Sequence, residues 1–436
     1  MSRPIASVAV LGAGTMGSGI AALSAERGCR VVLLDTGADL VERALARITA
    51  GRAPMLDDPA QAALITVGTF DRHLAEAGAC DWICEAIIED LAAKRALLSR
   101  IEAVRRNGTI LSTNTSGIPL RAITEGMPER LRRNIAVTHF FNPVKVMRLV
   151  ELVPGADTAP DVLAALEAFL CQRLGKGVVP AKDTVNFIGN RIGCFWMLAG
   201  LHKAGAARAA GLTTEDIDAL MAAPLGIPAT GLYGLIDLVG LDVLDFVARN
   251  LAANLPELDP GRPFVRLPAA EQAMLERGQI GRKAGGGFYR LRTLDDGSRN
   301  KETFDLATGT WRDAKAVALA PEHRDAASLL FGDDAAGRLA WEVMGGTLCY
   351  AADLLPEIAD DVVNVDRAMR WGFNWSEGPF ELIDAVGPER VIARLEHERA
   401  PLPKMLRVLH RSGAGRFYRD DGRACLGLDG NFHPIP

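Results

Sequence analysis

The sequence predicts an α/β domain built on a doubly wound parallel sheet over residues 1–184, followed by two similar all-α domains. Three observations predict this architecture. Short apolar strands alternate with helical stretches in the first 184 residues, as in parallel sheets joined by crossover helices. After Asp183 strand patterns nearly vanish and long helical segments take over. Within the helical part, three short motifs recur in the same order, which indicates a duplicated module.

The predicted strands of the first domain are short apolar runs bounded by glycine or polar residues. The first run, residues 5–11, leads through a glycine-rich turn into a helical stretch at 15–27, and Gly28 separates that stretch from the next strand. This is a βαβ unit. Further helical stretches are expected at 90–106 and 158–174. The predicted strands are 5–11, 30–35, 64–67, 81–84, 109–113, 135–140, 149–153 and 177–180.

The repeat in the second half has an offset of 147 or 148 residues. Ile-Asp-Leu-Val-Gly at 236–240 returns as Ile-Asp-Ala-Val-Gly at 383–387, residues 217–221 resemble 365–369, and Arg191-Ile192 resembles Arg338-Leu339. We therefore expect helical domains at 185–290 and 336–436, with the polar, turn-rich residues 291–335 as a linker or insertion.

Composition narrows the class of protein. A formal net charge of -5 argues against a nucleic-acid partner, which usually requires a strongly basic surface. The sequence contains no apolar run of 18 residues, so no membrane span is predicted. The seven cysteines are scattered without a CxxC pair, so neither a disulfide framework nor a metal site is expected, and the cytoplasm is the expected location.

The glycine-rich turn predicts a dinucleotide site in a Rossmann-type domain. Gly12, Gly14 and Gly17, with Thr15 and Met16, lie where a strand turns into a helix, so that backbone N–H groups can approach a pyrophosphate. Asp35 ends the second strand, where a carboxylate accepts hydrogen bonds from a ribose and repels a 2′-phosphate. The predicted cofactor is therefore NAD. A plain glycine turn beside a solvated Asp35 is the alternative.

A histidine and a glutamate form the candidate catalytic pair. His139 lies at the carboxyl end of an apolar strand, where open α/β sheets place groups that face ligands. Glu151 lies inside the next apolar strand, and burial of a carboxylate is costly unless it is paired. An imidazole would satisfy Glu151 and be oriented by it. A purely structural His139 is the alternative, and the mid-helix His202 is interpreted as packed or solvated.

These motifs, taken together, resemble the 3-hydroxyacyl-CoA dehydrogenase family over essentially the whole chain, including the repeat. The resemblance is to the bacterial fatty-acid β-oxidation branch with two helical domains, and we expect this chain to lack the enoyl-CoA hydratase half that relatives often carry. The motifs occur in family order: the glycine turn with Asp35, Glu85 to Glu89, Asn114 to Ser116, His139 to Pro143, Glu151, Lys182 to Thr184, Asn190-Arg191, Gly281 to Lys283, and Gly285 to Tyr289.

The resemblance implies the role of each site residue. His139 would be the base that accepts the proton of the 3-hydroxyl group while hydride passes from C3 to NAD, and Glu151 would orient it. Ser116 and Asn190 match positions that contact substrate oxygens. On the residues alone, Glu89 and Lys94 could be an ordinary helix surface, and Asn190 could make a local backbone contact. The positions matching dinucleotide contacts are Glu89, Lys94, Asn114, Asn142 and Lys283.

Two departures from the family pattern concern the hinge and the substrate carrier. Val185 stands where many relatives have proline after Lys-Asp-Thr. Residues 40–55 contain no lysine to meet CoA phosphates, only Arg43, Arg47 and Arg52, whose planar guanidinium groups bind phosphate with a different geometry. An acyl-CoA substrate, enoyl-CoA hydratase or thiolase partners, and a monomeric or homodimeric state therefore rest on the resemblance, and chain-length preference stays open.

Two other functions remain open from the sequence. One is a dehydrogenase of another small hydroxy acid on the same scaffold, although such relatives usually carry a single helical domain. The other is a non-catalytic NAD-binding protein. For the repeat, we expect residues 187–244 to pack against 338–391 within one chain in a pseudo-twofold arrangement. The second copy would not serve catalysis, because Gly337 stands where Asn190 would be.

Overall fold

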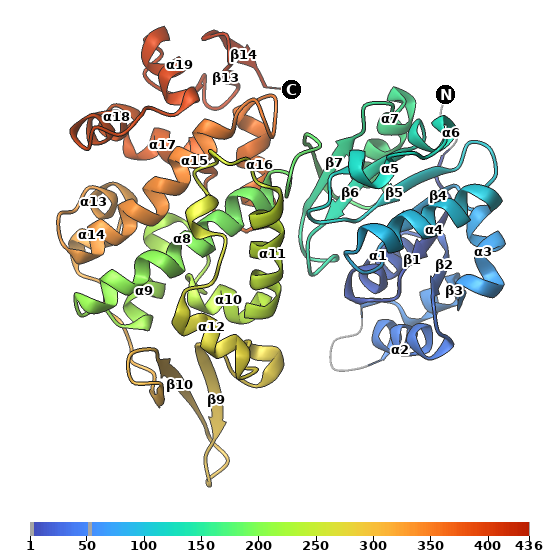
Figure 1. Ribbon diagram of the computed structural model, residues 1–436, viewed down its shortest axis with the longest axis horizontal. Coiled ribbons are helices and arrows are strands. Elements are labelled where there is room, and N and C mark those ends of the chain that lie inside the picture. The colour runs from blue at the N-terminus through green and yellow to red at the C-terminus, as the bar shows by residue number, and fades with distance from the viewer. Residues whose placement is uncertain (1–3, 51–54, 436) are drawn as a thin grey trace. The chain divides into compact units, whose positions relative to one another are not determined.

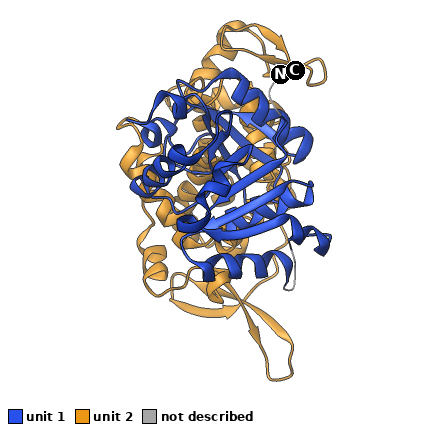
Figure 2. Ribbon diagram, turned by 90° about the vertical axis from the view of Figure 1, so that its right-hand side faces the viewer, with its two compact units in different colours: residues 1–188 blue, residues 189–436 orange. Residues whose placement is uncertain are grey.

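A computed structural model describes residues 4–50 and 55–435 of the chain. It contains two compact units, residues 1–188 and 189–436, coloured separately in Figure 2. The expected domain boundary near residue 184 thus lies close to the observed one. Arg52, one of the arginines considered for CoA phosphates, lies outside the described residues.

The N-terminal unit is built on one eight-stranded sheet, and all eight predicted strands are confirmed (Figure 1). The strand order is β3-β2-β1-β4-β5-β6-β7-β8, so the order reverses between β1 and β4. Ligands of doubly wound sheets bind at the carboxyl ends of the strands at such a switch point. The strands are β1 (Ser7–Leu11), β2 (Arg30–Asp35), β3 (Ile65–Thr69), β4 (Trp82–Glu85), β5 (Ile110–Thr113), β6 (Ile135–Phe140), β7 (Leu149–Pro154) and β8 (Gly177–Pro180).

The sheet differs from the expectation of a parallel sheet in one respect. The first six strands pair in parallel, but β7 is antiparallel to β6, and β8 follows the direction of β7. A parallel crossover needs a dozen or more residues, and only residues 141–148 connect β6 to β7. The short connection therefore forces the reversal. It also makes His139 and Glu151 direct cross-strand neighbours in the register.

Crossover helices join most of the strands (Figure 1). Helix α1 begins directly after the glycine turn, and α4 begins at an N-cap formed by Asp90, whose side chain accepts from the N–H of Ala93. The α-helices of this unit are α1 (Thr15–Glu26), α2 (Ala38–Thr49), α3 (Phe70–Gly78), α4 (Leu91–Val104), α5 (Leu120–Thr124), α6 (Glu129–Arg132) and α7 (Pro160–Ala168), which continues as one π-turn, Phe169–Arg173.

The C-terminal unit is rich in helices and contains both copies of the repeat. The first copy comprises α8 (Gly189–Ala209), α9 (Thr214–Leu220), α10 (Tyr233–Val239), α11 (Leu241–Asn254) and α12 (Ala269–Glu276). A short helix, α13 (Ala326–Leu330), precedes the second copy. That copy comprises α14 (Ala335–Ala340), which runs through a π-turn (Trp341–Gly345) into α15 (Gly346–Leu354), then α16 (Val362–Gly372), α17 (Pro379–Val386), α18 (Pro388–His397) and α19 (Lys404–Ser412).

Each copy also ends in a small antiparallel sheet, which the sequence analysis did not anticipate. Residues expected to form a linker at 291–335 instead include most of a three-stranded sheet, β9 (Tyr289–Thr293), β10 (Arg299–Asp305) and β11 (Thr310–Asp313). The second copy ends in β12 (Tyr418–Arg419), β13 (Ala424–Leu426) and β14 (Phe432–Pro434). The strands of the first sheet carry many charged residues and resemble loops in composition, and those of the second sheet are too short to show a pattern.

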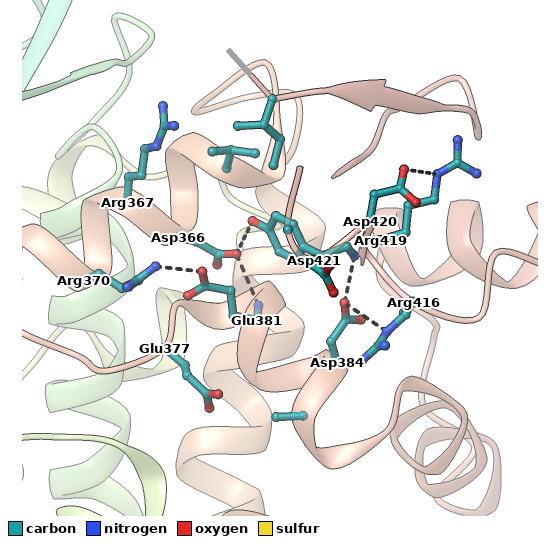
Figure 3. Close-up of a pocket in the computed structure, with 15 residues that line it drawn as sticks. Asp366, Arg367, Arg370, Glu377, Glu381, Asp384, Arg416, Arg419, Asp420 and Asp421 are labelled. Atoms are coloured by element: carbon teal, nitrogen blue, oxygen red, sulfur yellow. Dashed lines mark hydrogen bonds and ion pairs between the residues drawn. The ribbon is translucent and has the colours of Figure 1, made fainter. Parts of the chain in front are cut away.

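The two copies contain the same buried hydrogen-bond clamp. In the first copy Asp218 accepts from the N–H groups of Tyr233 and Gly234 and from the hydroxyl of Tyr289, at 2.6, 3.1 and 2.8 Å. In the second copy Asp366, labelled in Figure 3, accepts from the Tyr418 hydroxyl at 2.5 Å. It also accepts from the N–H of Phe380 at 2.8 Å. The two copies inferred from short motifs therefore share equivalent hydrogen bonds to equivalent aspartates.

The copies pack against each other within one chain, as expected from the sequence. Helix α8 contacts its own counterpart, the continuous helix formed by α14 and α15. The contact of α8 with α16 is matched by a contact of α14 with α9, as a pseudo-twofold arrangement requires. Gly193 allows the closest approach: a Cβ atom there would lie 2.0 Å from the ring of Phe373.

A buried charge cluster joins the copies at the start of α8. Arg191 is 1% exposed; its guanidinium donates to Asp259 and to the hydroxyl of Tyr350, and lies 3.3 Å from Glu357. The ring of Tyr350 also stacks on Phe195 at 4.1 Å between centroids. A buried arginine requires such partners, and the second copy supplies one carboxylate, Glu357, and one hydroxyl acceptor, Tyr350.

Within residues 4–50 and 55–435, no helix is long and apolar enough to cross a membrane. The same residues hold no group of three or more histidine, cysteine or acidic side chains arranged to bind a metal ion.

Candidate active site

The glycine turn between β1 and α1 is shaped for close approach. Gly12 has a φ of +115°, and a Cβ atom there would lie 2.4 Å from the carbonyl oxygen of Ala86. A Cβ atom at Gly17 would lie 1.8 Å from the carbonyl oxygen of Gly12. These two positions therefore require glycine.

The N-terminus of α1 remains available for an anion. Gly14 is the N-cap residue and no side chain caps the helix, while Gly14 and Thr15 are exposed and Met16 is half-buried. Uncapped N–H groups at the start of a helix are a binding site for a pyrophosphate. The turn thus fits the dinucleotide that the sequence predicted.

Asp35 ends β2 and contacts this turn directly. Its Oδ2 accepts from the N–H of Ala13 at 2.6 Å, and its Oδ1 accepts from the N–H of Thr36 at 2.6 Å. Asp35 is half-buried beside the turn, so it is not the free surface carboxylate of the alternative interpretation. A carboxylate held there has the place and the charge to accept ribose hydroxyls.

Two of the arginines considered for CoA phosphates, Arg43 and Arg47, have different partners and different exposure. Arg47 donates to the carbonyl oxygen of Ala13 at 2.7 Å and to the hydroxyl of Ser18 at 3.1 Å, so it stabilises the glycine turn. Arg43 lies on the exposed surface of α2 and pairs with Asp39 at 2.8 Å. Of the two, Arg47 is held by the glycine turn, and Arg43 is exposed.

His139 and Glu151 form a buried pair. Glu151 Oε2 lies 2.6 Å from Nδ1 of His139, and its Oε1 accepts from the N–H of Ile188 at 2.9 Å. The two residues are 5% and 0% exposed. An ionised carboxylate can only accept, so Nδ1 carries the proton and Nε2 offers its lone pair to a substrate. Phe141 and Phe187 pack beside the imidazole, with centroids 4.7 and 5.7 Å away.

Two asparagines lie at the same edge of the sheet. Asn114 follows β5, and its Oδ1 accepts from the N–H of Phe140 at 2.9 Å, which links β5 to the residue after His139. Asn142 lies two residues after β6 and is exposed. The peptide bond between Asn142 and Pro143 is cis. Asn114 therefore stabilises the end of β6 beside the His139–Glu151 pair.

Glu89 and Lys94 do not form the helix surface that the residues alone allowed. The Lys94 side chain is 1% exposed and its ammonium lies 3.2 Å from Glu89. Glu89 in turn accepts from the N–H of Ser116 at 2.8 Å. Although burial opposes both charges, the pKa of Glu89 is lowered by Lys94 and these hydrogen bonds, and the pKa of Lys94 is raised by Glu85 and Glu89.

Glu85 is a buried residue of this region for which no role was predicted from the sequence. This residue ends β4, is 1% exposed and binds Lys94 through both carboxylate oxygens, at 2.9 and 3.1 Å. The signal that could have found it is the one used for Glu151: a carboxylate in an apolar strand needs a buried partner.

The remaining two candidates belong to the C-terminal unit. Asn190 is half-buried in the first turn of α8, next to Arg191. Lys283 is exposed and pairs with Asp242 at 2.7 Å. His202 is half-buried and shares a hydrogen bond with the carbonyl oxygen of Arg266 at 2.8 Å, which agrees with a packed, non-catalytic role.

Known proteins resemble both units. The NAD-binding domain model of 3-hydroxyacyl-CoA dehydrogenases matches residues 7–184, and the C-terminal domain model of the same family matches residues 187–291. A probable 3-hydroxyacyl-CoA dehydrogenase of Bacillus subtilis is 34% identical over 96% of this chain, which spans 56% of that relative's length. This chain thus spans about half the length of these curated relatives, which match it along nearly its whole length.

Shorter relatives and solved structures agree. A 3-hydroxybutyryl-CoA dehydrogenase of Mycobacterium tuberculosis is 34% identical over 66% of this chain and 99% of its own length. The crystal structure of 3-hydroxybutyryl-CoA dehydrogenase from Escherichia coli has a TM-score of 0.67 at 25% identity, covering 95% of this chain and 99% of that one. With its NAD-binding domain, its helix-rich C-terminal unit and these matches, this chain belongs to the 3-hydroxyacyl-CoA dehydrogenase family of NAD-dependent oxidoreductases.

Proposed function

We propose that this protein oxidises (S)-3-hydroxyacyl-CoA to 3-ketoacyl-CoA with NAD, using His139 as the general base. The observation that supports this most directly is the buried pair of His139 and Glu151, at 2.6 Å, at the carboxyl end of β6 in an NAD-binding domain. A buried imidazole oriented by a carboxylate is the arrangement that proton transfer from a hydroxyl group requires.

The roles of the residues follow from their chemistry. Nε2 of His139 accepts the proton of the 3-hydroxyl group, and Glu151 stabilises the imidazolium that forms. Bound NAD supplies the hydride acceptor. The hydroxyl of Ser116 orients the substrate oxygen, and we assign the same task to Asn190 from the family resemblance. Exclusion of water by Phe141 and Phe187, which pack beside the ring, strengthens the charge pair.

The names of relatives support β-oxidation as the metabolic setting. A Rickettsia felis relative, 34% identical over 93% of this chain, is named a putative fatty acid oxidation complex trifunctional enzyme. An acyl-CoA substrate and association with other β-oxidation enzymes are therefore part of this proposal, although residues 40–55 lack lysine.

The test is the oxidation of NADH, measured by absorbance, with acetoacetyl-CoA and with a long-chain 3-ketoacyl-CoA. His139→Gln should keep its affinity for NADH and lose about 10²- to 10⁴-fold in kcat, which is what a positioned general base contributes. Glu151→Gln should also be severely impaired, because an amide cannot stabilise a positive imidazolium.

His202→Gln is the matched control, because His202 is a half-buried histidine that shares a hydrogen bond with a backbone carbonyl. It should retain wild-type activity. Near-native turnover of His139→Gln would refute the assignment of the base. Wild-type behaviour of Glu151→Gln beside an inactive His139→Gln would refute the pairing.

A further inference from the structure

Lys94 lies between two carboxylates of the N-terminal unit: Glu85, which is buried at the end of β4, and Glu89, which is half-buried in the loop between β4 and α4. Its ammonium is 2.9 and 3.1 Å from the two oxygens of Glu85 and 3.2 Å from Oε2 of Glu89. All three oxygens lie within reach of the three hydrogens of the ammonium group. The positive charge of Lys94 is therefore shared between Glu85 and Glu89.

Glu89 organises the loop that follows β5. Its Oε1 accepts from the hydroxyl of Thr115 at 2.6 Å and from the N–H groups of Ser116 and Gly117 at 2.8 and 3.0 Å. The hydroxyl of Ser116 lies 3.3 Å from the same oxygen, the longest of these contacts. The backbone of this loop is thus held tightly, and the Ser116 hydroxyl is held loosely enough to turn to a substrate.

Glu85 organises the loop that follows β4. Its Oε1 accepts from the N–H of Ile87 at 2.8 Å, and its Oε2 accepts from the hydroxyl of Thr113 at 2.6 Å. Ala86, which lies between Glu85 and Ile87, donates its N–H to the carbonyl oxygen of Leu11 at 2.7 Å. The carbonyl group of Ala86 faces the Cα of Gly12. The glycine turn therefore packs directly against the loop that follows β4.

We propose that Lys94 is a positioning residue that couples the loop behind the cofactor turn, residues 86–87, to the substrate loop, residues 115–117, through Glu85 and Glu89. The inference rests on the proposed function, because it takes Ser116 as a substrate contact. It differs from a direct contact between Lys94 and the dinucleotide, because the effect on catalysis passes through both loops.

Electrostatics explains why a lysine is needed there. Two buried carboxylates repel each other unless a positive charge lies between them, and breaking a buried ion pair leaves an uncompensated charge. In Lys94→Met, one carboxyl group must take up a proton to replace the lost charge. The loops then stay in place at low pH and separate as the pH rises. If Lys94 only stabilised the fold, Lys94→Met would not make the positions of the two loops depend on pH.

The first measurement is hydrogen exchange of the full-length protein, which needs no substrate. Lys94→Met should increase exchange at least tenfold in peptides covering both 86–88 and 115–118, because each loop loses a buried anchor. Lys145→Met is the matched control: Lys145 also bridges two carboxylates, Glu26 and Asp57, at 2.6 and 2.7 Å, and its removal should leave both loops unchanged. Unchanged exchange at 115–118 in Lys94→Met would overturn the coupling, whatever the enzyme's substrate.

The second measurement separates coupling from direct cofactor contact. Lys94→Met should raise the Kd of NADH and lower kcat at saturating NADH by about 10- to 100-fold, the usual range for a misplaced reacting group. The loss of kcat should grow with rising pH. Weaker NADH binding with wild-type kcat would identify Lys94 as a direct cofactor residue and overturn the proposal.

Two further variants keep the test valid if Lys94→Met folds poorly. Thr115→Val removes one donor to Glu89 at constant volume, and should lower kcat severalfold without changing the Kd of NADH. In the cycle of Lys94→Met with Ser116→Ala, the double variant should be no slower than the slower single variant, because both act through one group. Additive losses would contradict action through Ser116.

Absence of acetoacetyl-CoA reduction by the wild type would refute the proposed function instead, and the hydrogen-exchange result would still decide the coupling.

Discussion

The two helical copies retain the same internal clamp but differ on their surfaces. Asp237 in the first copy accepts from the N–H groups of Phe288 and Tyr289, and Asp384 in the second accepts from those of Phe417 and Tyr418. The duplicated aspartates therefore hold each helical copy to its terminal strand. Features that both copies share are needed for folding, so functional residues should be sought where the copies differ.

The clearest functional difference is at the start of the long helix. The first copy has Asn190, whereas the second has Gly337. A Cβ atom at Gly337 would lie 2.3 Å from the carbonyl oxygen of Gly332, so no side chain fits there without a backbone shift. The second copy has thus lost the candidate substrate contact and uses the space for tight packing.

The outer surfaces differ in charge. Large apolar side chains of α10 and α11 in the first copy are exposed: Leu238 is 57% and Phe246 is 44% exposed. Their counterparts by the repeat offset are Ala385 and Ala393. The second copy instead has a cavity of about 670 Å³, whose charged lining is shown in Figure 3. Arg367, Arg370 and Glu381 in that lining correspond to Ala219, Ala222 and Gly234 of the first copy.

The largest effect is expected where the copies touch. Gly193→Leu places a side chain against the ring of Phe373, so we expect a loss of about 3 kcal/mol in the free energy of unfolding, at the upper end of overpacking effects. Urea unfolding measures it. Gly205→Leu is the control on the same helix, because nothing lies within 4 Å of a Cβ atom there. Equal stability of the two variants would contradict packing of the copies within the chain.

The next effect separates the copies by function. Asn190→Ala should lower kcat/KM by about 10- to 100-fold without changing the melting temperature much, because a positioning contact is lost. Gly337→Ala should lower the melting temperature and leave kcat/KM intact. Steady-state kinetics and thermal unfolding of both variants decide this. A catalytic defect in Gly337→Ala would show that the second copy takes part in catalysis.

The smallest effect tests the equivalence of the clamps. Tyr289→Phe and Tyr418→Phe each remove one hydroxyl donor to a buried aspartate, Asp218 or Asp366. Each should cost about 1–2 kcal/mol in the free energy of unfolding, and the two costs should add in the double variant. A cost confined to one copy would show that the two clamps are not equivalent.

Much of the architecture was predictable because it depends on local patterns. Apolar runs and glycine boundaries identified all eight strands of the large sheet, and the spacing of short motifs identified the duplication. The His139–Glu151 pair was predictable as well, because a carboxylate in an apolar strand must find a buried partner. The small terminal sheets were not predicted, because the strands of the first carry many charged residues and those of the second are only two or three residues long.

Tertiary structure decided what depends on contacts between distant residues. The pairing of β7 with β6, which the short connection makes antiparallel, brings His139 opposite Glu151. Arg47 donates to the glycine turn and Lys94 contacts two carboxylates, and neither set of partners could be identified from the sequence. Sequence determines which charges must be paired, because burial makes an unpaired charge costly. Only the fold determines which partner each charge meets, because those partners come from other elements of the chain.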